Sequence, residues 1–262
     1  MNTLQQLFAD EKRKILSVFF TAGFPAFDST TQIIRGLWSA GVDLIEVGIP
    51  FSDPLADGQT IQHSSEVALK NGMTLKKLFA QLGTLSKEQN TNQCPVLLMG
   101  YLNSVLQYGF EEFCKDASRC GISGIILPDL PFTEYQNEYK SLFTRNNLQN
   151  IFLITPQTSE ERIRLFDAES DSFIYAVSTN STTGRRDHFS QEQLGYFKRI
   201  GGMKLKNSLL IGFGVSNSET FNQVTQHAAG AIVGSAFIRH LEQHGSSEKS
   251  IQQFVQTIKP LN

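Results

Sequence analysis

The sequence is poor in cysteine and shows no bias toward charge of one sign. Both features limit the classes of function that the protein can have. Its three cysteines, Cys94, Cys114 and Cys120, are odd in number, and no pair has the two-residue spacing of a zinc or redox motif. We therefore expect free thiols in a reducing compartment. The 23 basic and 25 acidic residues give a net charge of -2 and form no run of like charge. Binding to nucleic acid is not expected.

Long hydrophobic runs and flexible linkers are also missing. No segment approaches the roughly 18 continuous apolar residues of a membrane span, and the N-terminus MNTLQQLFADEKRK lacks the apolar stretch of a signal peptide. A cytoplasmic protein that does not contact membranes is therefore expected. With 40% hydrophobic residues and no tract rich in Pro, Gly or Ser, residues 1–262 are predicted to form a single domain.

Two common kinds of catalytic centre have no signature in this sequence. The five histidines show no metal-binding spacing, so no metal site is predicted, and they are interpreted as surface or helix residues. The histidines are His63, His188, His227, His240 and His244. No G-x-S-x-G motif is present, which argues against a serine nucleophile. Acidic residues remain as the candidates for catalysis.

Short apolar runs alternate with amphipathic stretches along the whole chain. The runs are residues 16–20, 44–47, 96–99, 124–127, 151–154, 173–177, 209–213 and 231–233, and they are typical of strands buried on both faces. The stretches 30–40, 75–85, 135–145 and 192–200 have the three- and four-residue spacing of helices. Eight such units predict an α/β fold, a single (β/α)8 (TIM) barrel with extra helices. An open doubly wound sheet is the alternative.

Hydroxyl residues followed three positions later by Glu or Gln predict where several helices begin. The four candidate capping boxes are Thr133 with Gln136, Thr158 with Glu161, Ser190 with Gln193, and Ser216 with Glu219.

An acid lies inside the second apolar run, LIEVGIP, and two more follow directly in PFSDPLADGQTIQ. In a barrel, Glu46 would enter the interior near the C-terminal strand ends, where active sites form. A desolvated Glu has a raised pKa and can give and take a proton near neutral pH, while an ionised Asp can balance positive charge. A lone loop aspartate is more often a cap or turn residue, but beside Glu46 we interpret Asp53 and Asp57 as part of a site.

Glycines stand at the ends of the last two predicted strands, in GFGVSNSE and GAIVGSAF, each before a serine and a helix. Glycine allows a ligand to approach the backbone, and N–H groups at a helix N-terminus attract phosphate. Barrels commonly bind phosphate with the loops after strands seven and eight. A phosphorylated ligand is therefore predicted, with Gly184 of STNSTTG as a further candidate contact.

The segment EVGIPFSDPLADGQTIQ is similar to the signature of tryptophan synthase α subunits. The resemblance covers nearly the whole chain, through TAGFP, MGYLNSVLQYG, PDLPFTE, YAVS, GFGVS and GSAF. It implies retro-aldol cleavage of indole-3-glycerol phosphate to indole and glyceraldehyde 3-phosphate. The sequence departs from the common pattern at Ser181, Thr182, Gln59 and Phe24.

The resemblance also implies a role for each matching residue. Glu46 would protonate C3 of the indole and handle the glycerol hydroxyl proton, while Asp57 would stabilise the charged ring. Four further residues would contact the substrate: Phe19 and Tyr101 in the indole pocket, Tyr175 at the ligand site, and Thr183 on a loop that closes over Asp57. The phosphate would contact Gly184, Gly212, Phe213, Gly214, Gly234 and Ser235. No metal or organic cofactor is expected in this chain.

A partner is implied by the resemblance alone. It would be the tryptophan synthase β subunit, which holds pyridoxal phosphate and receives indole in an α2β2 tetramer, with Asp53 and Pro54 facing it. Three alternatives remain open at this point. They are another phosphosugar barrel enzyme, a stand-alone indole-3-glycerol phosphate lyase, and a weakly active binding subunit that activates the β partner.

Overall fold

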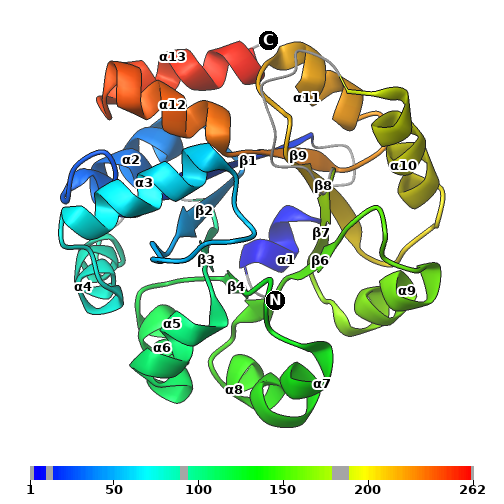
Figure 1. Cartoon of the computed structure of the whole chain (residues 1–262), viewed down its shortest axis with the longest axis horizontal. Coiled ribbons are helices and arrows are strands. Elements are labelled where there is room, and N and C mark those ends of the chain that lie inside the picture. Colours follow the sequence, from blue (N-terminus) through cyan, green and yellow to red (C-terminus); the bar gives the residue numbers. More distant parts are fainter. Residues whose placement is uncertain (1–2, 10–13, 89–93, 179–188, 261–262) are drawn as a thin grey trace.

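In the computed structural model, the apolar runs form one parallel sheet surrounded by helices (Figure 1). The structure describes residues 3–9, 14–88, 94–178 and 189–260. The strands are β1 (Ile15–Thr21), β2 (Leu44–Gly48), β3 (Val96–Met99), β4 (Gly124–Ile126), β5 (Gln149–Asn150), β6 (Phe152–Ile154), β7 (Phe173–Val177), β8 (Ser208–Gly212) and β9 (Gly230–Val233). Every predicted run coincides with a strand to within a few residues.

The sheet curves around until its two outermost strands become consecutive in the chain. Its order is β5-β4-β3-β2-β1-β9-β8-β7-β6, and only Ile151 separates β5 from β6. The amide of Ile151 itself donates to the carbonyl of Ile125 on β4 at 3.0 Å. The β5–β6 segment therefore joins both edges of the sheet, which makes a nearly closed (β/α)8 barrel and excludes the open doubly wound alternative.

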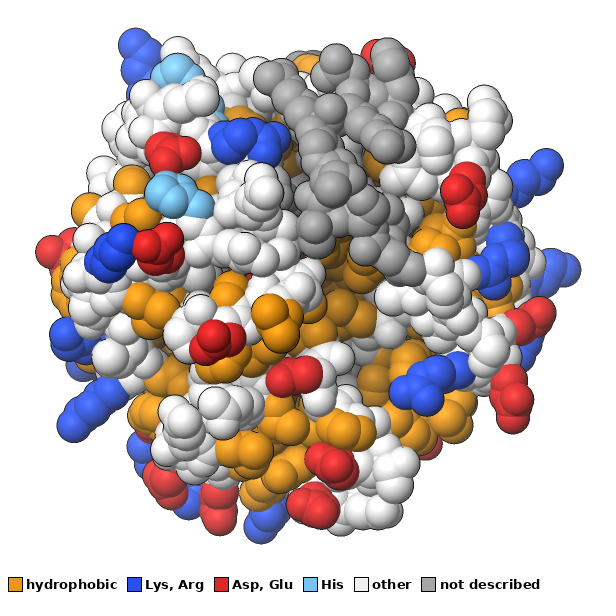
Figure 2. Space-filling model, viewed as in Figure 1, with side chains coloured by type: hydrophobic (Ala, Val, Ile, Leu, Met, Phe, Trp, Pro, Cys, Tyr) orange, Lys and Arg blue, Asp and Glu red, His pale blue; other side chains and the backbone are white. Residues whose placement is uncertain are grey.

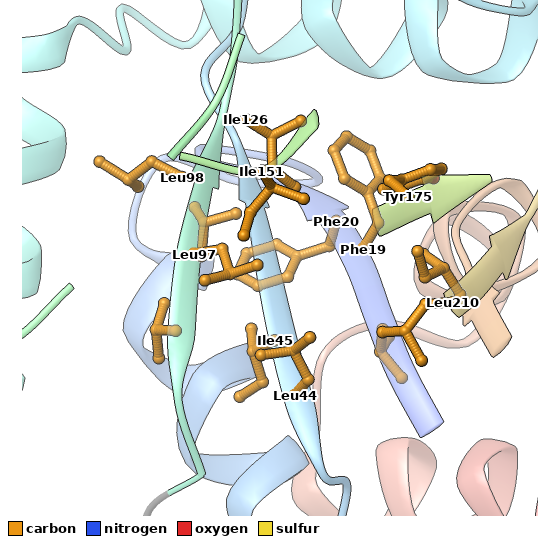
Figure 3. Packing of buried hydrophobic residues seen from close by; sticks show 14 of the residues in the cluster. Phe19, Phe20, Leu44, Ile45, Leu97, Leu98, Ile126, Ile151, Tyr175 and Leu210 are labelled. Atoms are coloured by element: carbon orange, nitrogen blue, oxygen red, sulfur yellow. The ribbon is translucent and has the colours of Figure 1, made fainter. Parts of the chain in front are cut away.

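Parallel register sets which side chains enter the barrel. Phe19 pairs with Glu46, and Glu46 pairs with Leu97 on the next strand, so these three side chains share one face of the sheet. Figure 3 shows buried apolar side chains from several strands gathered in one cluster, with Leu97 of β3 and Tyr175 of β7 on opposite sides of it. The interior is a filled core, and Glu46 is set within it.

Helices cover the outer face of the barrel in the order expected from the amphipathic stretches. They are α2 (Ser29–Ser39), α3 (Gln59–Lys70), α4 (Leu75–Leu85), α5 (Leu102–Tyr108), α6 (Phe110–Arg119), α7 (Phe132–Glu134), the π-helix η1 (Tyr135–Tyr139), α8 (Lys140–Arg145), α9 (Glu160–Glu169), α10 (Gln191–Gly201), α11 (Ser218–Val224), α12 (Ser235–His244) and α13 (Glu248–Ile258). The stretch predicted as one helix at 135–145 contains a π-helical turn, with α7 before it and α8 after it.

One predicted capping box is confirmed, and the others are wrong. Ser190 and Gln193 bond each other's backbone at the start of α10. At α9 the cap is Ser159, because the Thr158 hydroxyl instead accepts from the amide of Thr155. At α11 the cap is Asn217, one residue after the predicted serine, and α7 begins after a proline without a side-chain cap. Neighbouring polar residues compete for these positions, and the path of the incoming loop decides between them.

The extra helix α1 (Thr3–Leu7) covers the N-terminal end of the barrel. Phe8, just after it, stacks on Phe173 at the start of β7 with ring centroids 5.1 Å apart. The Thr3 hydroxyl contacts that of Ser123, just before β4, at 2.9 Å. The C-terminal strand ends lie at the opposite end of the barrel. In the described part of the chain, no helix is long and apolar enough to cross a membrane.

Candidate active site

Glu46, the third residue of β2, has no solvent exposure. The hydroxyl of Ser17, on the neighbouring strand β1, donates to its Oε1 at 2.6 Å. Its Oε2 has no hydrogen-bond partner among the described residues. Burial raises the pKa of Glu46 to about 7, although the Ser17 hydrogen bond lowers it. Near neutral pH this carboxyl can therefore both give and take a proton.

Asp57 lies in the loop between β2 and α3, where it is partly buried. The phenol of Tyr101 donates to its Oδ2 at 3.1 Å and also accepts from the amide of Ala56 at 3.2 Å. The side-chain amide of Gln62 donates to the Asp57 carbonyl at 2.8 Å, so the loop backbone is held as well. Burial raises the pKa of Asp57 to about 6, opposed by the Tyr101 hydrogen bond. At pH 7 Asp57 is therefore mostly ionised while Glu46 is about half protonated.

Tyr175 on β7 is influenced by both acids. It is 4% exposed, and its pKa is raised well above the usual range by burial first and then by the charges of Glu46 and Asp57. Its phenol group packs over Gly212, where a Cβ atom would lie only 2.8 Å from the Tyr175 ring. The phenol therefore stays neutral between the acid pair and the end of β8.

Phe19 forms another part of the wall. A Cβ atom at Gly48 would lie 2.5 Å from the tip of its ring, and one at Gly234 would lie 3.4 Å from the ring edge. Phe19 thus spans from the end of β2 to the end of β9. Two predicted substrate contacts, Phe19 and Tyr175, therefore lie in the barrel with Glu46.

The two glycine-rich strand ends lie beside each other. Gly212 pairs with Ile232, so the ends of β8 and β9 are adjacent. Phe213 has φ 70°, a left-handed conformation that is rare for a residue with a side chain, and Gly214 follows at φ 89°. The Ser178 hydroxyl, from the end of β7, donates to the Phe213 carbonyl at 2.6 Å. Strained backbone fixed by a side chain is often found at ligand sites.

The second glycine-rich end leads directly into a helix. Gly234 precedes α12, and Ser235 is the first residue of that ten-residue helix. The free N–H groups of its first turn and the ends of β8 and β9 could bind an anion together. Thr183 and Gly184, also predicted to contact the ligand, lie outside the described residues, as do Ser181 and Thr182.

Asp53 and Pro54 lie on the outer part of the same loop as Asp57. Asp53 is exposed, and Leu55 beside it is 90% exposed. The loop borders an open groove of about 530 Å³, which is lined by Phe51, Ser52, Pro54, Gln59, Gln62, His63, Glu66, Leu69 and Lys70. The predicted partner segment is therefore on the surface, separate from the buried acid.

Sequence reasoning missed two residues of this site. One is Ser17, whose signal was a polar residue in the apolar strand next to Glu46. The other is Phe51, which stacks on Tyr101 with ring centroids 4.9 Å apart and supports the phenol that contacts Asp57. Within the described ranges, no group of three or more His, Cys, Asp or Glu side chains could hold a metal ion.

Fold and site together define a barrel enzyme whose candidate active site has two carboxyl groups of raised pKa, one within β2 and one in the loop that follows its C-terminal end. On the face shown in Figure 2, hydrophobic side chains gather near the middle, and Lys and Arg lie mostly around the rim.

Comparison with known proteins gives the particular family. The model of the family described as tryptophan synthase alpha chain matches residues 5–261. The tryptophan synthase alpha chain of Christiangramia forsetii is 51% identical over 261 residues, which is 100% of both chains. That of Flavobacterium psychrophilum is 54% identical over 258 residues, 98% of this chain and 100% of the other. The chain therefore belongs to the tryptophan synthase alpha chain family.

Solved structures agree with this assignment. Tryptophan synthase subunit alpha from Legionella pneumophila str. Paris has a TM-score of 0.84 at 30% identity, covering 98% of this chain and 100% of that one. Tryptophan synthase from Mycobacterium tuberculosis also gives 0.84, at 29% identity over 97% of this chain and 95% of that chain. The predicted class of enzyme is confirmed. The chain is a carbon–carbon lyase of tryptophan biosynthesis that cleaves indole-3-glycerol phosphate, and another phosphosugar enzyme is excluded.

Proposed function

We propose that Glu46 and Asp57 carry out this cleavage as a general acid/base and an electrostatic stabiliser. The observation that supports this most is the buried Glu46 carboxyl, whose pKa of about 7 suits proton transfer in both directions. Asp57, with a pKa of about 6, is ionised at neutral pH and can stabilise a cation. The two environments assign different roles to two chemically similar groups.

The proposed reaction returns Glu46 to its starting state. Protonated Glu46 gives its proton to C3 of the indole, which becomes tetrahedral and places positive charge on the ring nitrogen beside Asp57. The Glu46 carboxylate then takes the proton of the glycerol hydroxyl, and a carbonyl forms there. The carbon–carbon bond breaks, and its electron pair restores the C2–C3 double bond and neutralises the ring. Indole and glyceraldehyde 3-phosphate are released, and Glu46 is again protonated.

The substrate phosphate is proposed to bind at the ends of β8 and β9. The backbone there belongs to Gly212, Phe213 and Gly214. The N-terminus of α12 is formed by Gly234 and Ser235. Gly184 belongs to the proposed phosphate site and Thr183 to the substrate contacts. Phe19 and Tyr101 would pack against the indole, and Tyr175 would contact the substrate.

A β subunit is proposed as the partner, in an α2β2 tetramer within the cytoplasm. The exposed Asp53 and the adjoining Pro54 lie on the loop that also carries Asp57, so a partner bound there could influence the site. Pyridoxal phosphate would be held by the β subunit. This chain requires no organic cofactor for the steps above, since each uses only proton transfer and charge stabilisation.

Indole release by the purified chain tests the proposal, alone and with a matching β subunit. Asp57→Asn and Glu46→Gln should each reduce kcat by about 100-fold or more while substrate binding persists. The exposed Asp28→Asn and Glu192→Gln, which make the same chemical changes elsewhere, serve as matched controls. Normal turnover in either site variant would overturn its assigned role. Fast release unaffected by the β subunit would indicate a stand-alone lyase, and no release in either case a binding subunit.

A further inference from the structure

One polar side chain in the barrel interior has no role in the cleavage described above. Ser17 lies in β1, whose sequence is ILSVFFT, and it has no solvent exposure. The other hydroxyl of this strand, on Thr21, contacts the Ser64 hydroxyl of α3 at 2.6 Å and thus has a structural partner. A buried hydroxyl requires a partner, and for Ser17 that partner is Glu46.

The strand register brings this contact about. Ser17 pairs with Leu44 on β2 and with Ile232 on β9, both apolar. Glu46 is two residues beyond Leu44 on the same face of β2, so it is the diagonal neighbour of Ser17. The Ser17 hydroxyl donates to Oε1 of Glu46 at 2.6 Å, a short distance typical of hydrogen bonds to a carboxylate.

We propose that Ser17 is a positioning residue that engages Oε1 of Glu46, so that Oε2 is the oxygen that exchanges protons with the substrate. This inference rests on the proposed role of Glu46. Oε2 is buried and has no partner among the described residues, as a proton-transfer atom requires before substrate binds. Because Oε1 is occupied by a donor, the proton of the neutral acid resides on Oε2.

Ser17 also favours the ionised form of Glu46 and opposes the effect of burial on its pKa. Two other ionisable groups act on this pocket among the described residues. Tyr175 on β7 is influenced by the charge of Glu46 and stays neutral, and Asp57 in the loop after β2 acts on the same phenol. Neither supplies a cation, and among the described residues Ser17 is the side chain that lowers the pKa of Glu46 against the effect of burial.

Ser17→Ala removes the donor to Glu46 and leaves the hydroxyl of Thr21 in place. We expect kcat to fall roughly 10-fold with little change in KM, because the carboxyl loses its fixed orientation. The alkaline limb of the kcat–pH profile, at about 7 for Glu46 in the wild type, should move up by about one pH unit. Ser17→Thr keeps a hydroxyl and should restore both properties. The pH titration of the protonated carboxyl band of Glu46, identified by infrared difference spectroscopy against Glu46→Gln, should show the same shift.

Ser64→Ala is the matched control, because it removes a buried hydroxyl that contacts the same strand but not Glu46. It should lower thermal stability without moving the pH profile. Wild-type kcat and pH profile in folded Ser17→Ala would overturn the positioning role. A lower kcat with an unmoved profile, not restored by threonine, would show a merely structural role and overturn it as well. If Glu46→Gln still cleaves substrate, the proposed function fails first, which is a separate result.

Discussion

Replacing Glu46 with glutamine should make the fold gain stability relative to wild type as pH rises, while it reduces kcat by about 100-fold or more. The ordinary pKa of 4.5 applies to the unfolded chain, and in the barrel the pKa is about 7 because the charged form is desolvated. Between these values the folded protein binds more protons than the unfolded chain, so wild-type stability falls as pH rises. Below 4.5 both states are protonated, and the destabilisation is complete above about pH 7.

The magnitude follows from the difference of about 2.5 pH units between folded and unfolded Glu46. At about 1.36 kcal/mol per unit, ionising this carboxyl in the barrel costs on the order of 3 kcal/mol of unfolding free energy. Glutamine has the shape of the protonated acid and no charge at any pH. Its amide N–H groups lack a partner at the former Oε2, but that cost is the same at every pH.

Urea unfolding of wild type and Glu46→Gln at about pH 4.5 and about pH 8 measures the effect. The difference in unfolding free energy should change by about 3 kcal/mol in favour of the variant across this interval. The contribution of Asp57 to the pH dependence of the unfolding free energy is present in both proteins and cancels in the difference. Glu192→Gln, an exposed change of the same type, should show little pH dependence. A difference between wild type and Glu46→Gln that stays constant with pH would refute the assignment of a neutral, desolvated acid inside the barrel.

Two further perturbations test other parts of the site. Tyr101→Phe removes the donor to Asp57 and should raise its pKa above about 6; the acid limb of kcat/KM, which requires ionised Asp57, then moves up by roughly one pH unit. An unmoved acid limb would mean that the limb does not report the ionisation of Asp57. Gly234→Asp puts a like charge beside the proposed phosphate and a side chain against Phe19, and should weaken substrate binding by about 10-fold or more in calorimetric titration. Unchanged affinity would exclude this loop. Gly195→Ala serves as the control for folding, because no atom lies near its Cβ position.

The barrel was predictable because its strands are buried on both faces. Each apolar run in the sequence became a strand, and the number of alternating units indicated the closed sheet. Helix starts were less predictable. Thr158 and Ser159 are equally suitable caps by composition, and only the backbone geometry of the loop decided that Ser159 caps α9. The π-helical turn at Tyr135–Tyr139 likewise has no periodicity signal that distinguishes it from an α-helix.

The candidate site was predictable where the signal was local. Glu46 was conspicuous as an acid in an apolar strand, and Asp57 followed in a loop of prolines and glycine. Its hydrogen bonds were not predictable, since Ser17 is 29 residues from Glu46 and Tyr101 is 44 residues from Asp57. Those contacts depend on strand register and on which loop lies beside which.

Because Gly212 has no side chain, the Tyr175 ring can pack against the end of β8. The phenol of Tyr175 occupies the space that a Cβ atom would fill, and the same ring is close enough to respond to the charges of Glu46 and Asp57. The Tyr175 ring therefore lies against Gly212 of the proposed phosphate site and within reach of the charges of both proposed catalytic acids. A shift of the β8 end on phosphate binding would displace that ring. The surroundings of both acids would then differ between the free enzyme and the enzyme with phosphate bound.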